Sequence, residues 1–211
     1  GLIGQAPHIA TFLAEERENF RGLLYGGPMK TFAPLFGLAM LTSFAMATET
    51  PDYKVLVQDG KFELRDYPAL TLVRTASGDG DFMRLFRYIS GGNEADQEIA
   101  MTAPVLMENE GGQGGMSFIL PRDVAAGKVP VPKDAAVTMD DLPAGHFAVY
   151  RFSGGRNQAN EEEALGKLRA WVDKRRLEVE GEPLFAYYDP PWIPTFLRRN
   201  EVMLRMSGTQ P

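Results

Sequence analysis

The sequence contains no cysteine and only two histidines, His8 and His146, among its 211 residues. Without cysteine the chain has no disulfide framework, no thiolate metal site and no cysteine nucleophile. Two histidines are too few for a multi-histidine metal centre, and no histidine is paired with a carboxylate or a nucleophile motif. These shortages favour a protein that binds a ligand over an enzyme that transforms one.

A basic stripe is also missing. The net charge is −6, and acidic and basic residues are mixed along the chain. Proteins that bind nucleic acid gather lysine and arginine on one face, so nucleic acid is not expected as a partner. The apolar share of 44% and the charged share of 24% are those of an ordinary globular chain, and the length suits one domain with a sizeable core.

Residues 29–47 differ from the rest of the chain. Lys30 precedes an apolar run over 32–44, and the small residues Ala45 and Ala47 follow it. This order is typical of a secretory signal peptide, and the run is shorter than the roughly 20 residues that a membrane span needs. We therefore expect a periplasmic or secreted protein. The alternative is an N-terminal helix and membrane anchor.

Residues 1–28 precede this segment and do not begin with methionine. Because a signal peptide normally begins a chain, we interpret 1–28 as an upstream extension, with translation from Met29 as the expectation in vivo. The mature form is then expected to have no stable membrane span. Its folded domain is expected over 53–207.

Within 53–207, strand patterns alternate with two helix patterns. Segment 61–67 alternates apolar and polar residues as a half-buried strand does, and 69–77 follows as its continuation or hairpin partner. Apolar residues at helical spacing over 82–89 predict a short helix that ends at Gly91-Gly92. A longer helix is predicted over 157–179, with acidic residues in its first turn and basic residues near its end.

The order strand, helix, strand, strand occurs twice. Asp66-Tyr67-Pro68-Ala69 opens the first unit and Asp141-Leu142-Pro143-Ala144 opens the second, and each unit continues through a strand to one of the predicted helices. Two such units can bury their apolar sheet faces against each other. The expected fold class is α+β, a distorted antiparallel β-barrel built from two βαββ-type repeats with two flanking helices.

Three segments carry a resemblance to a known family. They are RYISGGN (87–93), IAMTAPV (99–105) and YDPPWIPTFLRRNEVML (188–204), and the likeness extends over about 53–206. In these segments the chain resembles the SOUL / haem-binding protein family. The resemblance implies a barrel of two repeats and non-covalent binding of haem, with other porphyrins as further ligands.

The resemblance also implies where the tetrapyrrole would lie, against the first helix and the loop between the last two strands. Aromatic faces there would stack on the macrocycle, and an arginine would meet a propionate. Carried over by position, the binding residues are Phe82, Met83, Phe86 and Arg87 on the helix, and Tyr188, Pro190, Pro191 and Trp192 on the loop. The alternative for Phe82 and Phe86 is a core position, and for Arg87 a solvated one.

An axial ligand to haem iron is less clearly indicated. His146 begins a strand of the second repeat, and a lone strand histidine serves either as a ligand or as a structural side chain. Tyr187, Tyr188, Met83 and Met101 are further candidates. Binding through apolar contacts alone is the remaining option, and it predicts modest affinity with loose specificity among porphyrins.

Two polar motifs have architectural interpretations. In IAMTAPV, Pro104 biases Ala103 toward an extended backbone, while Thr102 can bond to nearby backbone. Asn200 and Glu201 are expected to tie the last loop to its strand, with Arg198 or Arg199 as partners.

The sequence thus predicts an exported carrier, buffer or scavenger of haem or another tetrapyrrole, without turnover. Two alternatives are a haem-modifying enzyme, which removes iron or opens the ring, and a general small-molecule sensor module. The oligomeric state and the physiological tetrapyrrole are left open.

Overall fold

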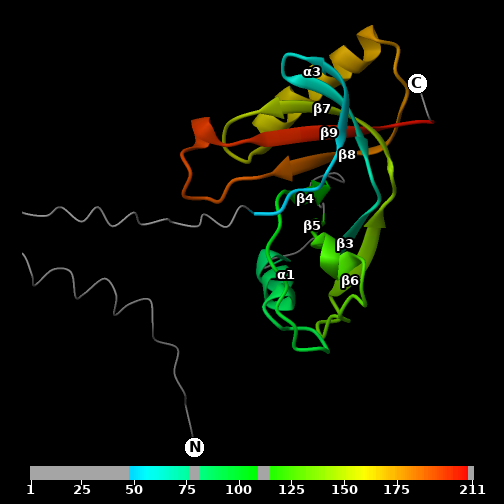
Figure 1. Cartoon of the computed structure of the whole chain (residues 1–211). Helices are drawn as coiled ribbons and strands as arrows, with labels where there is room; N and C mark the ends of the chain where they lie inside the picture. Colours follow the sequence, from blue (N-terminus) through cyan, green and yellow to red (C-terminus); the bar gives the residue numbers. More distant parts are fainter. Residues whose placement is uncertain (1–47, 77–80, 109–114, 209–211) are drawn as a thin grey trace, which may run out of the picture. The chain divides into compact units, whose positions relative to one another are not determined.

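The structure, a computed structural model, describes residues 48–76, 81–108 and 115–208 (Figure 1). The predicted signal peptide and upstream extension lie outside these residues. The described chain forms nine strands, three α-helices and one 3-10 helix. In chain order they are β1 (Lys54–Asp59), β2 (Phe62–Tyr67), β3 (Leu70–Thr75), α1 (Asp81–Ile89), β4 (Val105–Glu108), β5 (Met116–Ile119), α2 (Arg122–Ala125), β6 (Val137–Leu142), β7 (Gly145–Phe152), α3 (Gln158–Lys174), β8 (Val179–Tyr187), η1 (Thr195–Leu197) and β9 (Asn200–Met206).

All nine strands belong to one antiparallel sheet. Their order is β1-β2-β7-β9-β8-β4-β5-β3-β6, so β1 and β6 are the edges. Within the described chain these two edge strands do not pair with each other, and the sheet is open. The α+β class is therefore confirmed, whereas the expected closed barrel is not.

The two-repeat arrangement appears in the strand pairing. In the first unit, β5 lies between β3 and β4, and in the second unit β9 lies between β7 and β8. The units join where β4 pairs with β8. The strand that precedes each unit pairs with the first strand of the other unit: β2 pairs with β7, and β6 pairs with β3. The hairpin alternative for 61–67 and 69–77 is therefore wrong, because β2 and β3 do not pair with each other. The continuation is confirmed: Tyr67 pairs with Gly145 and Leu70 with Leu142, so β3 extends β2 past Pro68 in the same register.

Helix α3 covers the second half of the sheet. Its buried residues Ala164, Leu168, Trp171 and Val172 form one core cluster with side chains of β7 and β9. The indole of Trp171 stacks on Phe62 of β2, with ring centroids 5.5 Å apart. Asn157 caps the helix by accepting a hydrogen bond from the Asn160 amide. The helix ends at Lys174 and not at 179, because residues from Val179 onward pair as β8.

Helix α1 covers the first half with a different face from the one that the spacing suggested. Leu85, Tyr88 and Ile89 are buried, whereas Phe82 and Phe86 are 43% and 42% exposed. The alternative of a core position for the two phenylalanines therefore does not apply. They lie along the flank of the helix, where a ligand can reach them.

The IAMTAPV segment connects α1 to β4 as the architectural interpretation predicts. The Thr102 hydroxyl is buried and donates to the Ile119 carbonyl oxygen at the end of β5. The Ala103–Pro104 peptide bond is cis, which the sequence did not indicate. The segment fixes where β4 enters the sheet.

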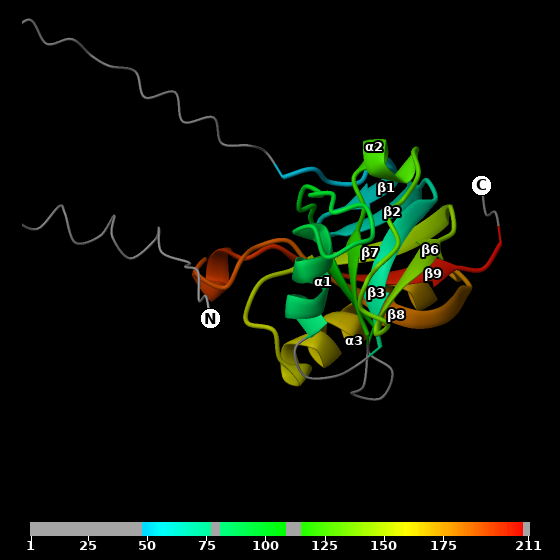
Figure 2. The ribbon, with the colours of Figure 1, turned by 90° about the horizontal axis from the view of Figure 1, so that it is seen from below.

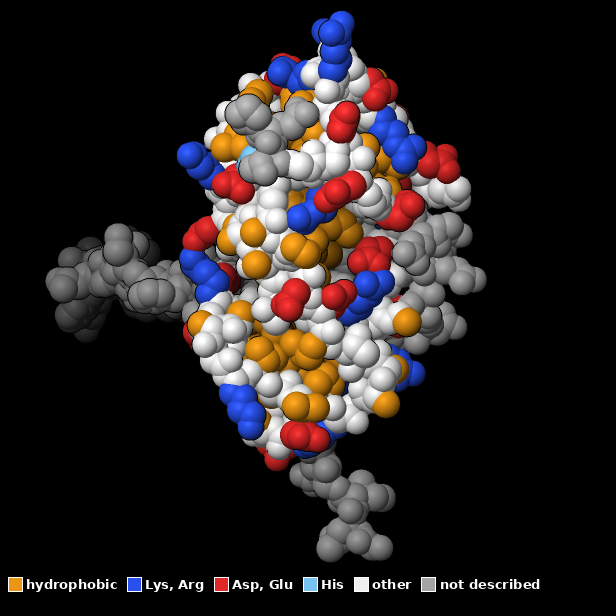
Figure 3. All heavy atoms as spheres, turned by 90° about the vertical axis from the view of Figure 1, so that its right-hand side faces the viewer, with side chains coloured by type: hydrophobic (Ala, Val, Ile, Leu, Met, Phe, Trp, Pro, Cys, Tyr) orange, Lys and Arg blue, Asp and Glu red, His pale blue; other side chains and the backbone are white. Residues whose placement is uncertain are grey.

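The surface seen in Figure 3 carries acidic and basic side chains interspersed, with apolar side chains between them. This agrees with the mixed charge pattern along the sequence. Among the residues that the structure describes, no helix is both long and apolar enough to cross a bilayer.

Candidate functional site

A cleft of about 220 Å³ lies where α1 meets the connection between β8 and β9. Its floor is apolar, because strands β4 and β5 contribute Val105, Met107 and Met116. Its rim is polar and carries two arginines. The lining consists of Phe82, Val105, Met107, Met116, Gly154, Arg156, Tyr187, Asp189, Pro191, Arg198 and Asn200.

The α1 side of the cleft is aromatic. Phe82 packs edge-on against the buried Phe118 of β5, with ring centroids 5.4 Å apart. The Phe86 ring lies one helical turn further along, at an interplanar angle of 13° to Phe82 and with centroids 6.1 Å apart. Two nearly parallel, half-exposed rings on one helix flank offer flat apolar surface to a ligand.

The opposite side is the connection 188–199, here called the β8–β9 loop, which carries η1. The Arg198 guanidinium donates to the backbone carbonyl oxygens of Ile193, at 2.8 Å, and of Pro191. The Ile193 amide donates to Pro190 at 3.1 Å, and the Gly154 amide donates to Thr195 at 2.9 Å. Three prolines and these internal bonds hold the loop in one conformation.

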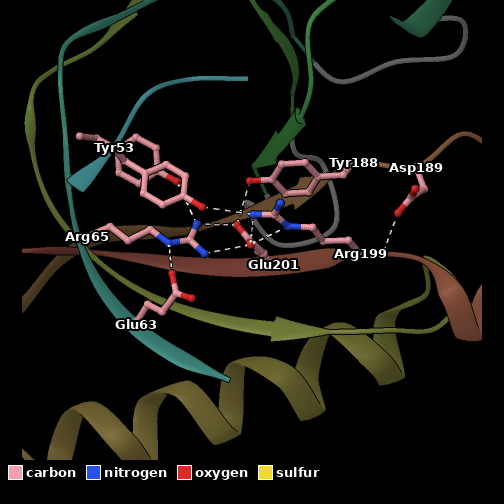
Figure 4. A network of polar contacts seen from close by, with 8 residues as sticks. Tyr53, Glu63, Arg65, Tyr188, Asp189, Arg199 and Glu201 are labelled. Carbon is pink, nitrogen blue, oxygen red and sulfur yellow. Dashed lines mark hydrogen bonds and ion pairs between the residues drawn. The ribbon is translucent and has the colours of Figure 1, made fainter. Parts of the chain in front are cut away.

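The base of the β8–β9 loop is fixed by a buried network of charges (Figure 4). The Arg65 guanidinium donates two hydrogen bonds to the Glu201 carboxylate, at 2.7 and 3.0 Å. Arg199 donates to the same carboxylate at 2.8 and 3.0 Å, and the Tyr188 hydroxyl donates to it at 2.9 Å. Glu63 accepts from Arg65 at 2.6 Å, so two carboxylates balance two guanidiniums.

Aromatic rings complete this network. The Arg65 guanidinium lies 4.2 Å from the ring centroid of Tyr53, and that of Arg199 lies 3.9 Å from the ring centroid of Tyr188. Both contacts are cation–π interactions. The Arg199 backbone amide also donates to the Asp189 carboxylate at 2.6 Å, which holds the two ends of the loop together.

The network sets the protonation of its members. Burial alone would raise the pKa of the Glu201 carboxyl, but its bonds to Arg65 and the charge of Arg199 outweigh burial and lower that pKa below 4.5. Burial and the adjacent Glu201 raise the pKa of Tyr188. Burial raises the pKa of Tyr67 to about 12. Glu201 is therefore ionised and the two tyrosines are neutral at physiological pH.

The structure brings together two of the eight residues that the resemblance suggested for binding, since Phe82 and Pro191 line the cleft from opposite sides. The other α1 residues do not line the cleft: Phe86 lies beside Phe82, and Met83 and Arg87 are exposed. On the loop, Tyr188 belongs to the charge network, Pro190 is half-buried, and Trp192 is 80% exposed.

His146 lies far from this cleft. It stands near the start of β7, where its Nε2 atom is 3.8 Å from a carboxylate oxygen of Asp66. Phe152, at the other end of β7, pairs with Asn200 in the cleft lining. Six residues of strand separate the two ends by about 20 Å. A ring bound in the cleft would therefore not be ligated by His146.

Other candidate ligands are closer. Tyr187 lines the cleft, and its hydroxyl donates to Glu161 of α3. Burial and this bond raise the pKa of Tyr187, which disfavours the tyrosinate form that binds ferric iron. The thioethers of Met107 and Met116 also line the cleft. In the described part of the chain, no cluster of three or more His, Asp or Glu side chains is arranged to hold a metal ion by itself.

Sequence reasoning missed most of the cleft. Met107 and Met116 were not singled out, and Arg156 follows a Gly-Gly pair in the β7–α3 connection without any motif of its own. Of the two arginines predicted as partners of Glu201, the structure confirms Arg199 and not Arg198, and it adds Arg65, which the sequence did not indicate. Only the pairing of β4 with β5 and β8 brings these residues beside α1.

The comparisons with known proteins agree with this architecture. A family model described as "SOUL heme-binding protein" matches residues 48–205, which is most of the chain. The chain belongs to the SOUL haem-binding protein family. "Heme-binding protein 2" of Homo sapiens is 30% identical over 180 residues, which cover 76% of this chain and 87% of that protein. "Heme-binding protein 1" of Xenopus tropicalis is 29% identical over 156 residues, 67% of this chain and 81% of that one.

Solved structures share the fold at low sequence identity. The C-terminal domain of EcmrR matches with a TM-score of 0.50 and 11% identity, over 74% of this chain and 99% of that one. EcmrR in a complex with DNA matches with a TM-score of 0.53 and 13% identity, over 70% of this chain and 57% of that one. At this identity the likeness concerns the fold of the SOUL domain alone.

Proposed function

We propose that this SOUL-family protein binds haem or a related tetrapyrrole non-covalently in the cleft between α1 and the β8–β9 loop. We further propose that it does so as an exported carrier, buffer or scavenger, without turnover. The observation that supports the site is the cleft itself, in which an aromatic helix flank, an apolar strand floor and two rim arginines face one space.

The chemistry of the lining fits the ligand. A tetrapyrrole is a flat apolar ring with propionates on one edge, so it needs an apolar surface and cations at its rim. Phe82 and the floor residues Val105 and Met107 supply the surface. Arg156 and Arg198 supply the cations. Arg198 uses two of its N–H groups to hold the loop, and its remaining donors can meet a carboxylate.

The size of the cleft limits how much of the ligand is covered. At about 220 Å³ it is smaller than the roughly 300 to 1,000 Å³ of pockets that enclose a drug-sized molecule. A macrocycle would insert one edge and leave the rest against Phe82, Phe86 and solvent. This predicts modest affinity and tolerance among porphyrins, which suits a carrier that must release its ligand.

The experiment is a titration of the protein with haemin and with iron-free protoporphyrin, followed by the Soret absorbance. Phe82→Ser removes a cleft ring and is expected to weaken binding about tenfold. Phe196→Ser is the matched control, because this phenylalanine is 73% exposed and does not line the cleft. Arg156→Gln is expected to weaken binding about threefold to tenfold through the lost charge-assisted bond to a propionate.

Two results would contradict the site: equal affinities for Phe82→Ser and Phe196→Ser, or a shifted Soret band in His146→Ala. Similar affinities for haemin and protoporphyrin would support binding by apolar contacts, and a clear preference for haemin would indicate an iron ligand such as Met107 or Met116. Loss of the Soret band with reductant and oxygen, with bile pigment or free porphyrin appearing, would refute a carrier role and indicate an enzyme. Absence of any spectral change with either ligand would favour the general sensor module.

A further inference from the structure

The tip of the β8–β9 loop exposes the three most exposed large apolar side chains of the described chain. Trp192 is 80% exposed, Phe196 is 73% exposed and Leu197 is 64% exposed, and the next such residue, Val131, is 52% exposed. None of the three lines the cleft. Large apolar side chains gathered in one segment at this exposure usually mark a surface that contacts another apolar phase.

The tip is also convex. In Figures 1 and 2 the segment that carries η1 projects beyond the strands that it connects. The bonds from Arg198 to Pro191 and Ile193, and from Gly154 to Thr195, keep this shape without burying the tip. A projecting, internally bonded tip suits insertion into a soft, flat medium better than it suits a preformed groove on a protein.

The charge of the tip is also consistent with insertion into such a medium. Residues 190–200 contain two arginines and no aspartate or glutamate, in a chain whose net charge is −6. Glu201 balances the charge of Arg199. Arg198 donates to backbone carbonyl oxygens only, and among the described residues no ion pair includes it. Tryptophan, phenylalanine and leucine beside an arginine that is not engaged in an ion pair match the interfacial layer of a bilayer with anionic lipid.

We propose that the β8–β9 loop is a lipid-docking element, in which Trp192, Phe196 and Leu197 insert into the interfacial region of a bilayer. The docked loop forms one wall of the cleft through Pro191 and Arg198. The mouth of the cleft then faces the membrane, from which an apolar ligand can enter. Lipid docking does not require that the ligand be a tetrapyrrole.

The two tryptophans of the chain allow a local test. Trp171 is 8% exposed in the core under α3, whereas Trp192 is at the tip. The full-length Trp171→Phe variant therefore reports on Trp192 alone. With vesicles of phosphatidylcholine and phosphatidylglycerol, we expect its emission to shift to the blue and to be quenched by lipids brominated on the acyl chains.

Variants separate the loop from the rest of the chain. Phe196→Ser and Leu197→Ser are each expected to lower the vesicle partition coefficient of the reporter about tenfold. Val131→Ser, an exposed apolar residue in the α2–β6 connection, is the matched control and is expected to change nothing. If Trp171→Phe fails to fold, the unmodified chain and Trp192→Phe give the same comparison, because quenching must be present in the first and absent in the second.

Three outcomes would overturn the proposal. In the first, the protein sediments with vesicles but Trp192 is not quenched, which would assign the binding to another segment such as the apolar run 32–44. The second is an absence of binding. In the third, the Trp192 emission shifts with protein concentration in the absence of lipid, which would identify a second copy of the chain as the partner. Haemin titration without vesicles tests the proposed function separately, because Phe196 and Leu197 lie outside the cleft.

Discussion

We predict that Glu201→Gln, which neutralises the centre of the buried charge network, strongly destabilises the fold. The carboxylate is fully buried and accepts five hydrogen bonds, from Arg65, Arg199 and Tyr188. Glutamine has nearly the same shape, so packing is kept while the charge is lost. Its amide group would also point N–H donors at guanidinium donors.

The magnitude follows from what is left unpaired. Arg65 is 1% exposed and would keep only Glu63 as a counter-charge. Breaking a buried ion pair by neutralising one partner costs about 3 to 5 kcal/mol. For a domain of this size that corresponds to a fall in melting temperature of about 6 to 20 °C. Urea unfolding followed by circular dichroism at pH 7 measures the free energy directly.

Glu180→Gln is the matched control. Glu180 pairs with Arg205 at 2.9 Å, but its side chain is 52% exposed. An exposed pair contributes about 0.2 to 1 kcal/mol, so this variant should unfold close to the parent chain. If Glu201→Gln lost no more stability than Glu180→Gln, the reasoning from burial would be refuted.

The pH dependence gives a second readout with a fixed sign. The pKa of Glu201 is lowered from 4.5 in the folded protein, so its ionisation stabilises the fold above about pH 4.5. That contribution is lost as the pH falls below 4.5 and through the folded-state pKa. Glu201→Gln should remove this part of the acid destabilisation, and coinciding slopes for the two proteins below pH 4.5 would count against the network.

Two further predictions concern the two halves of the core. Leu168→Ala removes a fully buried side chain of α3, and we expect the free energy of unfolding in urea to fall by about 2 to 5 kcal/mol. Leu197→Ala, at the exposed loop tip, should change that free energy little. Asn93→Ala removes a buried side-chain amide, just after α1, that donates to the carbonyl oxygens of Tyr88 and Gln97. We expect the free energy of unfolding to fall by about 1 to 3 kcal/mol. Hydrogen exchange should increase only in α1 and in the segment that follows it.

The sequence predicted element types better than it predicted which faces are buried. In β9 the alternate residues Val202, Leu204 and Met206 belong to the core cluster that also contains residues of α3. Met203, on the other face, belongs to a second core cluster, because β9 lies in the middle of the sheet. Alternation cannot distinguish a solvent-facing side from a second buried side. For the same reason Arg65, which is on the polar side of the alternating segment 61–67, is buried although the pattern indicated an exposed position.

The candidate site could be predicted only in part, because it forms between segments distant in the sequence. Helical spacing in α1 fits two overlapping faces, and packing on the sheet selects Leu85 and Ile89 for the core while leaving Phe82 for the cleft. The loop was identified by its resemblance to the family. Its neighbours Met107 and Arg156 are placed there by the strand order, which depends on long-range pairing that no local pattern encodes.

A buried ion network at the base of the β8–β9 loop needs a reason, because apolar residues of similar volume usually stabilise a fold at least as well. Hydrogen bonds between guanidinium and carboxylate are directional, so Arg199 and Tyr188 are held at fixed angles at the two ends of the loop. An apolar loop without this constraint would lower its free energy by collapsing onto the neighbouring apolar cleft and closing it. We infer that the network keeps the cleft open and the tip exposed. Glu201→Gln, studied at a temperature where it stays folded, should therefore bind haemin more weakly than the parent chain, and unchanged affinity would leave the network with a role in stability alone.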